Sequence, residues 1–127
     1  MKRPVIFICC PLTPRSDTQN HAIEYLGNIR RAACFGAKLI VEGFAVYCPA
    51  NDFLYWLANE CPPTADDIYQ ADLSLVLKSD AIYAFGCVGQ SPNCRREIET
   101  ATEHGIPIFY SQLSLYTWKR DVWYGKK

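Results

Sequence analysis

The chain has 127 residues, enough to bury one hydrophobic core, and half of its residues are hydrophobic while a fifth are charged. Its 13 basic residues balance its 13 acidic residues, which argues against a protein that coats nucleic acid or binds an anionic membrane surface. No apolar run reaches the roughly 18–20 residues that cross a bilayer, and no signal peptide precedes the first predicted strand, so we expect a cytoplasmic protein without a membrane partner.

The first part of the chain alternates predicted strands with one long predicted helix. Residues 5–10 are a continuous apolar run, as expected of a strand buried on both faces, and 11–17 predict a loop. From about residue 18, apolar residues recur every three or four positions up to a stop at Gly43, which predicts a helix, and 44–48 predict a short strand. The stripe expected to face the core comprises Ala22, Leu26, Ile29, Ala33, Ala37 and Ile40.

Two helices are predicted next. Asp52 is a candidate cap for a short helix over 53–57, because its side chain can accept hydrogen bonds from the first backbone N–H groups. Thr64 followed by Asp67 resembles a capping box, so a second helix is expected from there to about residue 78.

The remaining elements are a strand, a helix and another strand. Residues 81–85 are apolar throughout, which predicts a buried strand. Ser91 can cap a helix, Pro92 suits its first position, and Gly105 supplies its end. The apolar run over 106–110 predicts the last strand.

Apolar strands that alternate with helices indicate an α/β fold with a mainly parallel, Rossmann-like sheet. We expect a single domain over 1–127, with its core in about 4–110 and an aromatic tail in 111–127. Open parallel sheets bind ligands beyond the carboxyl ends of their strands. The loops 11–17, 49–52 and 86–93 should therefore converge on any site.

Two carboxylates lie on helix faces that should be buried. Glu97 sits at the edge of an apolar stripe, and Asp72 projects from the middle of the stripe on the preceding helix. A buried carboxylate must be paired, hydrogen-bonded or protonated, so each could cap a loop or pair with an arginine. The alternative is catalytic. Chemistry at the anomeric carbon of a sugar needs one carboxylate as nucleophile and a second acidic group to protonate the leaving group.

The chain has seven cysteines and no CxxC pair, and its two histidines do not supply a metal-binding cluster. Without a secretory signal, the expectation is reduced thiols packed as small hydrophobic residues. The alternative is a metal site formed by Cys61, Cys87 and Cys94 after folding.

Two segments of the chain resemble the nucleoside 2-deoxyribosyltransferase superfamily, which includes the 2'-deoxynucleoside 5'-phosphate N-hydrolases and short relatives of similar length. They are "IYQADLSLVLKSDAIYAFG" and "QSPNCRREIETATEHGIPIF". The shared pattern is an opening strand and loop, a helix with Asp-Leu ahead of a Ser-Asp strand start, then a loop and a helix that bears a glutamate. It covers most of residues 4–110. The resemblance implies a five-stranded parallel sheet with helices on both faces, assembled as homodimers or higher homo-oligomers.

The resemblance also implies an activity, the cleavage of the N-glycosidic bond of a nucleoside or nucleotide. Glu97 matches the glutamate that forms a covalent deoxyribosyl enzyme, and Asp72 matches the aspartate that holds the base and assists its departure. Ser91 has the spacing of a serine that contacts the 5'-phosphate in the hydrolase branch. Water as the second substrate gives hydrolysis, and a free base gives transfer. No metal or cofactor is expected, because a carboxylate pair suffices.

Further substrate-binding residues are expected on the first strand and in the loops, and some of them depart from the family pattern. Phe7 stands where the family usually has a tyrosine, and Cys10 and Pro11 replace a small residue or glycine. Asn51 and Asn93 are the other candidates. The departures favour an alternative to an enzyme, a module of the same fold that senses or sequesters a nucleotide-derived ligand. A further alternative is an interaction protein whose aromatic tail and Trp56 segment form an oligomer surface.

Overall fold

The computed structural model describes residues 2–14, 20–58, 60–86 and 88–126. The start of the first helix predicted near residue 18 therefore lies outside the described residues, and so does Cys87. No helix within the described ranges is both long and apolar enough to cross a membrane.

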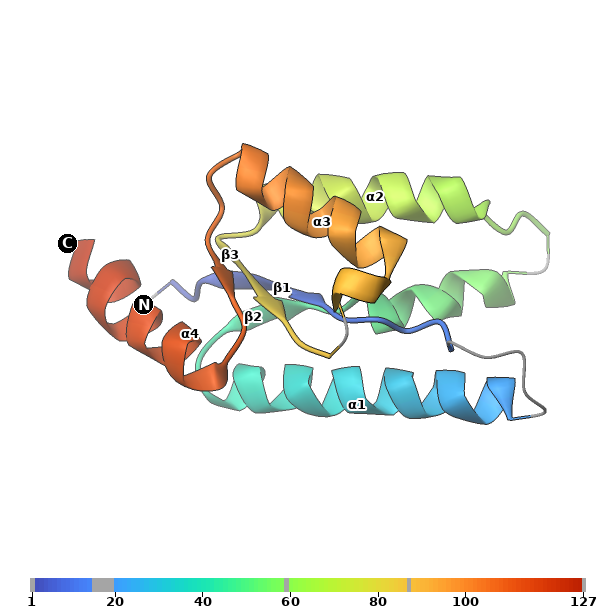
Figure 1. Cartoon of the computed structure of the whole chain (residues 1–127), viewed down its shortest axis with the longest axis horizontal. Helices are drawn as coiled ribbons and strands as arrows, with labels where there is room; N and C mark the ends of the chain where they lie inside the picture. The colour runs from blue at the N-terminus through green and yellow to red at the C-terminus, as the bar shows by residue number, and fades with distance from the viewer. Residues whose placement is uncertain (1, 15–19, 59, 87, 127) are drawn as a thin grey trace.

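Four parallel strands form the sheet, which has the order β2-β1-β3-β4 (Figure 1). The two central strands are β1 (Val5–Cys9) and β3 (Ala81–Ala84), flanked by β2 (Ala45–Tyr47) and β4 (Ile108–Phe109). The central strands are almost wholly buried, which explains their continuous apolar sequences. The predicted α/β class with a parallel sheet is confirmed. The described residues form four strands, whereas the resemblance implied five.

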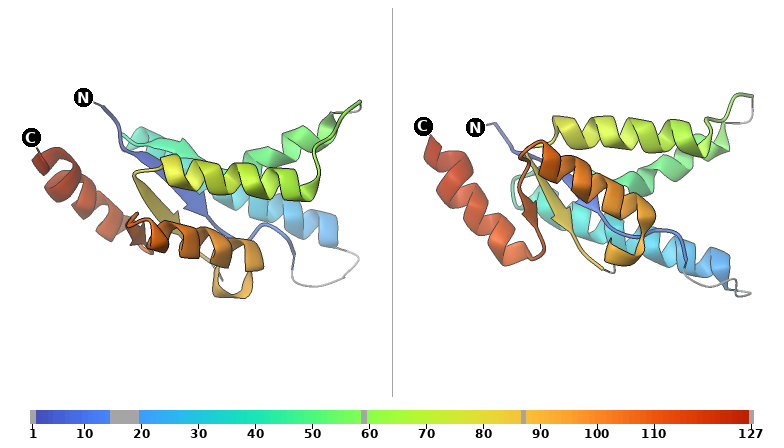
Figure 2. Two further views of the ribbon diagram at one scale, coloured as in Figure 1. Left: turned by 90° about the horizontal axis from the view of Figure 1, so that it is seen from above. Right: turned by 45° about the horizontal axis from the view of Figure 1, so that its top comes forward.

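Helices cover both faces of the sheet. Figures 1 and 2 show α1 (His21–Val41) on one side and α2 (Ala65–Lys78) with α3 (Pro92–Glu103) on the other. Alternate side chains of β1 point to opposite faces. Ile6 and Ile8 therefore pack in the core beneath α1, while Phe7 and Cys9 pack beneath α2 and α3.

The predicted helix starts have two outcomes. Thr64 and Asp67 form a complete capping box at α2, and the Ser91 hydroxyl accepts a hydrogen bond from the Cys94 N–H at the start of α3, as predicted. The predicted cap at Asp52 is wrong. A 3₁₀ helix, η1 (Pro49–Leu57), begins earlier, after Cys48, so Asp52 lies inside it, with a buried side chain.

The predicted core stripe of α1 is also wrong, because the buried face is rotated by one residue, or about 100° around the helix. The buried positions of this helix are Ala32, Gly36 and Leu39. In the predicted stripe, Leu26 and Ile40 are at least half exposed. Of that stripe, only Ile29 packs against the core.

The C-terminal tail is helical and joins the core. Its first helix is α4 (Gln112–Trp118), followed by a π-helical turn, η3 (Lys119–Trp123), and a 3₁₀ turn, η4 (Tyr124–Lys126). Leu115 has no exposed surface and lies in the core on the α1 side. The Trp123 Nε1–H donates to the Lys2 carbonyl oxygen at 3.2 Å, which places the two ends of the described chain side by side (Figure 1).

Candidate functional site

A cavity of about 240 Å³ opens at the carboxyl edge of the sheet. Residues that follow β1, residues that follow β2 and the first turns of α3 contribute to its wall, as expected for a parallel sheet. Tyr25 of α1 and three residues of α2 complete it. The described lining residues are Cys10, Leu12, Thr13, Tyr25, Pro49, Asp52, Trp56, Ile68, Tyr69, Asp72, Ser91, Asn93, Cys94 and Glu97.

Most of the predicted site residues meet at this cavity. Asp72 and Glu97 line it together with three predicted binding residues, Ser91, Cys10 and Asn93. Neither carboxyl group is drawn away into an ion pair, since the one ion pair in the described part of the chain joins Arg120 to Asp121.

Three of the predicted binding residues lie elsewhere. Phe7 has no exposed surface and stacks on Tyr47 in the core, with 5.5 Å between the ring centroids, so it does not reach the cavity. Asn51 is exposed on η1 and is not part of the cavity wall. Pro11 lines two neighbouring cavities instead, one of about 520 Å³ on the α1 side and one of about 250 Å³ beside the start of α3.

Asp72 belongs to a buried hydrogen-bonded group with Asp52 and Tyr47. The Tyr47 hydroxyl lies 2.5 Å from Oδ1 of Asp52 and 3.1 Å from Oδ1 of Asp72, so it bridges the two carboxyl groups. Burial, followed by a hydrogen bond to Asp52 and the Asp52 charge, raises the pKa of Asp72 to about 8. Asp72 therefore carries a proton at neutral pH and can act as an acid.

Glu97 lies on the other wall of the cavity, on the second turn of α3, and is 7 % exposed. Burial is the main cause that raises its pKa to about 8, and the charges of Cys94, Asp72 and Asp52 act in the same direction. A hydrogen bond with Cys9 acts in the opposite direction. The charge of Asp72 thus affects the pKa of Glu97 across one cavity, although the two residues belong to different helices.

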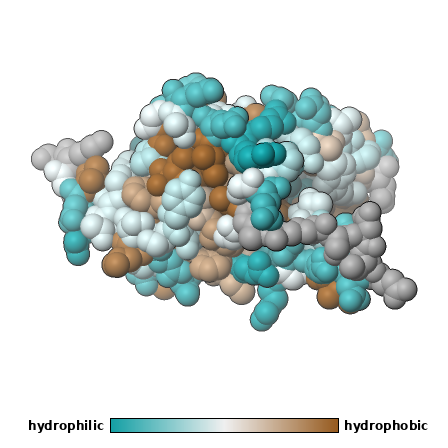
Figure 3. Space-filling view, in the orientation of Figure 1, coloured by the Kyte–Doolittle hydropathy of each residue, from teal (hydrophilic) through white to brown (hydrophobic). Residues whose placement is uncertain are grey.

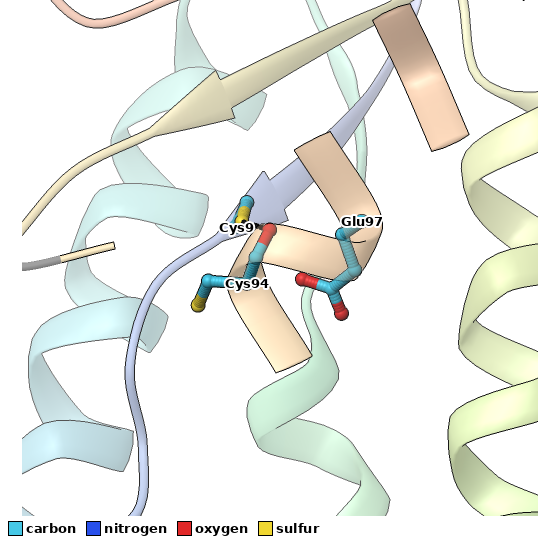
Figure 4. A group of neighbouring side chains, drawn as sticks. All are labelled: Cys9, Cys94 and Glu97. Carbon is cyan, nitrogen blue, oxygen red and sulfur yellow. Dashed lines mark hydrogen bonds between the residues drawn. The ribbon is translucent and has the colours of Figure 1, made fainter. Parts of the chain in front are cut away.

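Two cysteines, Cys9 and Cys94, lie beside Glu97 (Figure 4). Cys9 ends β1, and its thiol donates to the carbonyl oxygen of Cys94 over 3.7 Å. Hydrogen bonds with Cys9 and then Ser91 lower the pKa of the Cys94 thiol to about 7, against the effect of burial. The hydrogen bond with Cys94 and burial raise the pKa of Cys9 far above its usual range. A thiol on α3 is therefore close to ionisation beside a protonated glutamate.

The described wall of the cavity is acidic. It holds three buried carboxyl groups, those of Asp52, Asp72 and Glu97, and no described lysine, arginine or histidine. Three aromatic side chains, Tyr25, Trp56 and Tyr69, provide apolar surface that could stack on a planar base.

Three hydrogen-bonding residues of the site were not predicted from the sequence: Tyr47, Asp52 and Cys9. The aromatic lining residues Tyr25, Trp56 and Tyr69 were not predicted either. The sequence places Tyr47 and Cys9 in predicted strands and Asp52 at a predicted helix cap, and neither position indicates a role in a site. One signal was present for Asp52, because it follows the carboxyl end of a strand in a loop that was expected to converge on the site. The contacts of Tyr47 and Cys9 join distant parts of the chain, and a single sequence does not show them.

The described residues contain one group of side chains whose ligand atoms could hold a metal ion. It consists of Cys9, Cys94 and Glu97. The alternative metal site of the sequence analysis shares Cys94 with this group, but its Cys61 is exposed between η1 and α2, and Cys87 is not described.

Comparisons with known protein families and with curated proteins identify no relative of the chain. No model of a known protein family matches the chain, and a search of curated proteins finds no significant match.

Proposed function

We propose that this protein cleaves the N-glycosidic bond of a nucleoside or nucleotide, and that it belongs to the nucleoside 2-deoxyribosyltransferase superfamily that its sequence resembles. The observation that carries the proposal is the meeting of Asp72 and Glu97. These two buried carboxyl groups come from different helices and line one cavity at the carboxyl edge of a parallel sheet. Within the described ranges no basic side chain forms an ion pair with either group.

In the proposed reaction, Glu97 is the nucleophile. An oxygen of its ionised carboxylate attacks the anomeric carbon of the sugar, and the bond from that carbon to the base nitrogen breaks. Water then attacks the anomeric carbon and gives a proton to the carboxylate that Asp72 has become, the ester to Glu97 breaks, and the free sugar leaves. A second base in place of water gives transfer instead of hydrolysis.

Asp72 is the proposed acid. It carries the proton that the departing base takes up. Burial and the neighbouring Asp52 raise its pKa and keep it protonated near neutral pH, against the hydrogen bond from Tyr47, which lowers that pKa. Tyr25, Trp56 and Tyr69 line the same space and can hold the base by stacking.

Ser91 and the start of α3 offer a place for the rest of the substrate. A second cavity, of about 250 Å³, adjoins the first and shares Thr13, Ser91 and Asn93 with it. The first backbone N–H groups of a helix attract anions. A 5'-phosphate could bind here while the base occupies the acidic cavity.

One observation favours the alternative, a module that binds a nucleotide-derived ligand without cleaving it. The pKa of Glu97 is raised to about 8, so at neutral pH most molecules carry a protonated Glu97, which is not a nucleophile. For an enzyme, base release should therefore have its maximum near pH 8, because Glu97 must be ionised while Asp72 keeps its proton.

The test is release of free base from a panel of deoxynucleosides, ribonucleosides and their 5'-monophosphates, followed by chromatography with and without an acceptor base. We expect release by the wild-type protein and a loss of at least about 100-fold in Glu97→Gln, because general acid–base catalysis alone contributes about 10²–10⁴-fold and the nucleophile is also removed. Asp72→Asn should lose activity mainly toward substrates whose base needs a proton to leave.

Matched controls come from the same helices. Glu99→Gln and Asp66→Asn remove exposed carboxylates from α3 and α2 and should leave base release unchanged. The mass of the acid-quenched wild-type protein should include a sugar adduct, and Glu97→Gln should carry none. Absence of base release from every substrate, with a thermal shift still produced by one of them, would instead support the binding module.

A further inference from the structure

Three ligand atoms from β1 and α3 converge beside the cavity. The Sγ atoms of Cys9 and Cys94 and a carboxylate oxygen of Glu97 all lie within 4.8 Å of one another, and all three residues are buried. Figure 4 shows that Cys9 comes from the end of β1, whereas Cys94 and Glu97 come from successive turns of α3. We propose that these three residues form a binding site for a thiophilic divalent cation of the Zn²⁺ class.

The local structure explains why the three side chains meet. Cys94 and Glu97 are three residues apart on a helix and therefore lie on one face. The Ser91 cap and Pro92 fix where this helix begins, which places that face toward the sheet. Cys9 is the last residue of the buried central strand and points to the same side of the sheet as α3.

The donor set selects the class of metal. Hard cations such as Mg²⁺ and Ca²⁺ prefer oxygen ligands, whereas two thiolates and one carboxylate suit Zn²⁺ and related ions. Zinc bonds are about 2.3 Å to sulfur and about 2.0–2.2 Å to carboxylate oxygen, so tetrahedral ligands lie under about 4 Å apart. The three ligand atoms lie within 4.8 Å of one another, so metal binding would draw them closer together.

The surroundings favour a cation. Asp52 and Asp72 line the same cavity as Cys94 and Glu97, and no described basic side chain lines its wall. A cation at the three ligands would offset the negative charge that these carboxyl groups carry when they are ionised. Because the cavity borders Cys94 and Glu97, a fourth coordination position would open into it, as it does in zinc sites that keep a water or a ligand.

This site goes beyond the proposed function and does not rest on it. If both hold, the cation and the sugar compete for Glu97, so a bound metal would inhibit base release. Metal binding is measured without any nucleoside, so failure of one proposal is distinguishable from failure of the other.

The experiment titrates the reduced, metal-free protein with Co²⁺, whose spectrum reports thiolate ligands, under a reductant that does not bind metals. We expect one equivalent of Co²⁺ to give a thiolate-to-cobalt charge-transfer band and the strong visible bands of a tetrahedral site. One equivalent of Zn²⁺ should abolish both. Competition with a chromophoric chelator then gives the Zn²⁺ affinity of each variant.

Cys94→Ser should weaken Zn²⁺ binding by at least about 100-fold, because even loss of a group that only hydrogen-bonds a ligand costs about 10–100-fold. Glu97→Gln should keep the sulfur band and bind more weakly. Cys9 has no exposed surface, so a folding defect in Cys9→Ser is a known risk, and the other two variants decide the matter if that variant does not fold.

Cys34→Ser and Cys61→Ser are the matched controls, because both thiols are exposed and lie outside the group. Both variants should bind Zn²⁺ as the wild type does. The proposal is overturned if the wild type shows no charge-transfer band, if Cys94→Ser keeps it, or if either control removes it.

Discussion

The hydroxyl group of Tyr47 lies within hydrogen-bonding distance of two buried carboxyl groups. Its oxygen lies 2.5 Å from Asp52 and 3.1 Å from Asp72, and its ring stacks on Phe7. Tyr47→Phe keeps the ring and removes the bridge, which leaves the two acids with one partner fewer in a buried setting. We expect the free energy of unfolding to fall by about 1–3 kcal/mol, the usual effect of removing one partner from a buried polar group.

Urea unfolding measures this loss, with Tyr110→Phe as the control. The Tyr110 side chain is 61 % exposed, so its hydroxyl can bond to water in either state. Equal stability of Tyr47→Phe and the wild type would show that the bridge contributes nothing.

Asp72 also makes stability depend on pH. Its pKa is about 8 in the folded protein against an ordinary value of 3.8, so the folded state binds more protons than the unfolded state between these values. The free energy of unfolding should therefore fall as the pH rises from about 4 to about 8. Asp72→Asn removes this titration and should flatten the slope. Glu97, whose pKa is raised in the same direction, should contribute a slope of the same sign that remains in the variant.

Denaturation at a series of pH values measures the slope, and Asp66→Asn is the control, because Asp66 is exposed on the same helix. A slope of the opposite sign, with stability rising from pH 4 to 8, would mean that Asp72 is ionised in the folded protein.

At the level of elements, the start of α2 rests on two reciprocal hydrogen bonds. The Thr64 hydroxyl accepts from the Asp67 N–H at 3.1 Å, and the Asp67 carboxylate accepts from the Thr64 N–H at 3.0 Å. Thr64→Ala should lower the free energy of unfolding by about 1 kcal/mol, as the loss of a side-chain cap usually does. Ser74→Ala, at an exposed position in the middle of the same helix, is the control and should leave stability unchanged or raise it slightly. No loss in Thr64→Ala would show that solvent satisfies these N–H groups equally well.

Local signals predicted the starts of α2 and α3 because a cap depends on residues three positions apart. The apolar runs of β1 and β3 were predicted for a similar reason: burial on both faces leaves a continuous pattern that needs no partner to be seen. The strand predicted over 106–110 is shorter in the structure, where β4 pairs only at Ile108 and Phe109, because it is at the edge of the sheet. Pairing length depends on the neighbouring strand, which the sequence of the edge strand does not specify.

The site was predicted to the extent that helix periodicity could reveal it. Asp72 and Glu97 were found because each interrupts or borders an apolar stripe, and both are buried. Phe7 was assigned to substrate binding, but the alternation of side chains along β1 turns it into the core. Tyr47 and Asp52 lie on a short strand and on an irregular helix, where no periodic pattern marks an exception.

The whole molecule leaves one apolar face of α1 uncovered. In the described structure this helix has two apolar faces about 100° apart, and the predicted stripe is the face that contacts the core only through Ile29. Apolar residues also reach the surface between hydrophilic ones on the face shown in Figure 3. The exposed large hydrophobic side chains of α1 are Ile23 (69 %), Leu26 (59 %), Ile40 (50 %) and Val41 (83 %). An apolar pattern that the fold does not bury is typical of an interaction surface.

The homo-oligomer implied by the resemblance should therefore bury this face of α1 against a second copy. If so, Leu26→Lys should shift the protein to a lower mass in light scattering after size-exclusion chromatography, because a charge in an apolar interface is costly. The same change should leave the melting temperature of the monomer nearly unchanged, since Leu26 makes few contacts in the isolated chain. Leu113→Lys alters an even more exposed leucine, on α4, and should not change the mass. A wild-type protein that is monomeric at every concentration would refute the oligomer, and an oligomer unaffected by Leu26→Lys would place its interface elsewhere.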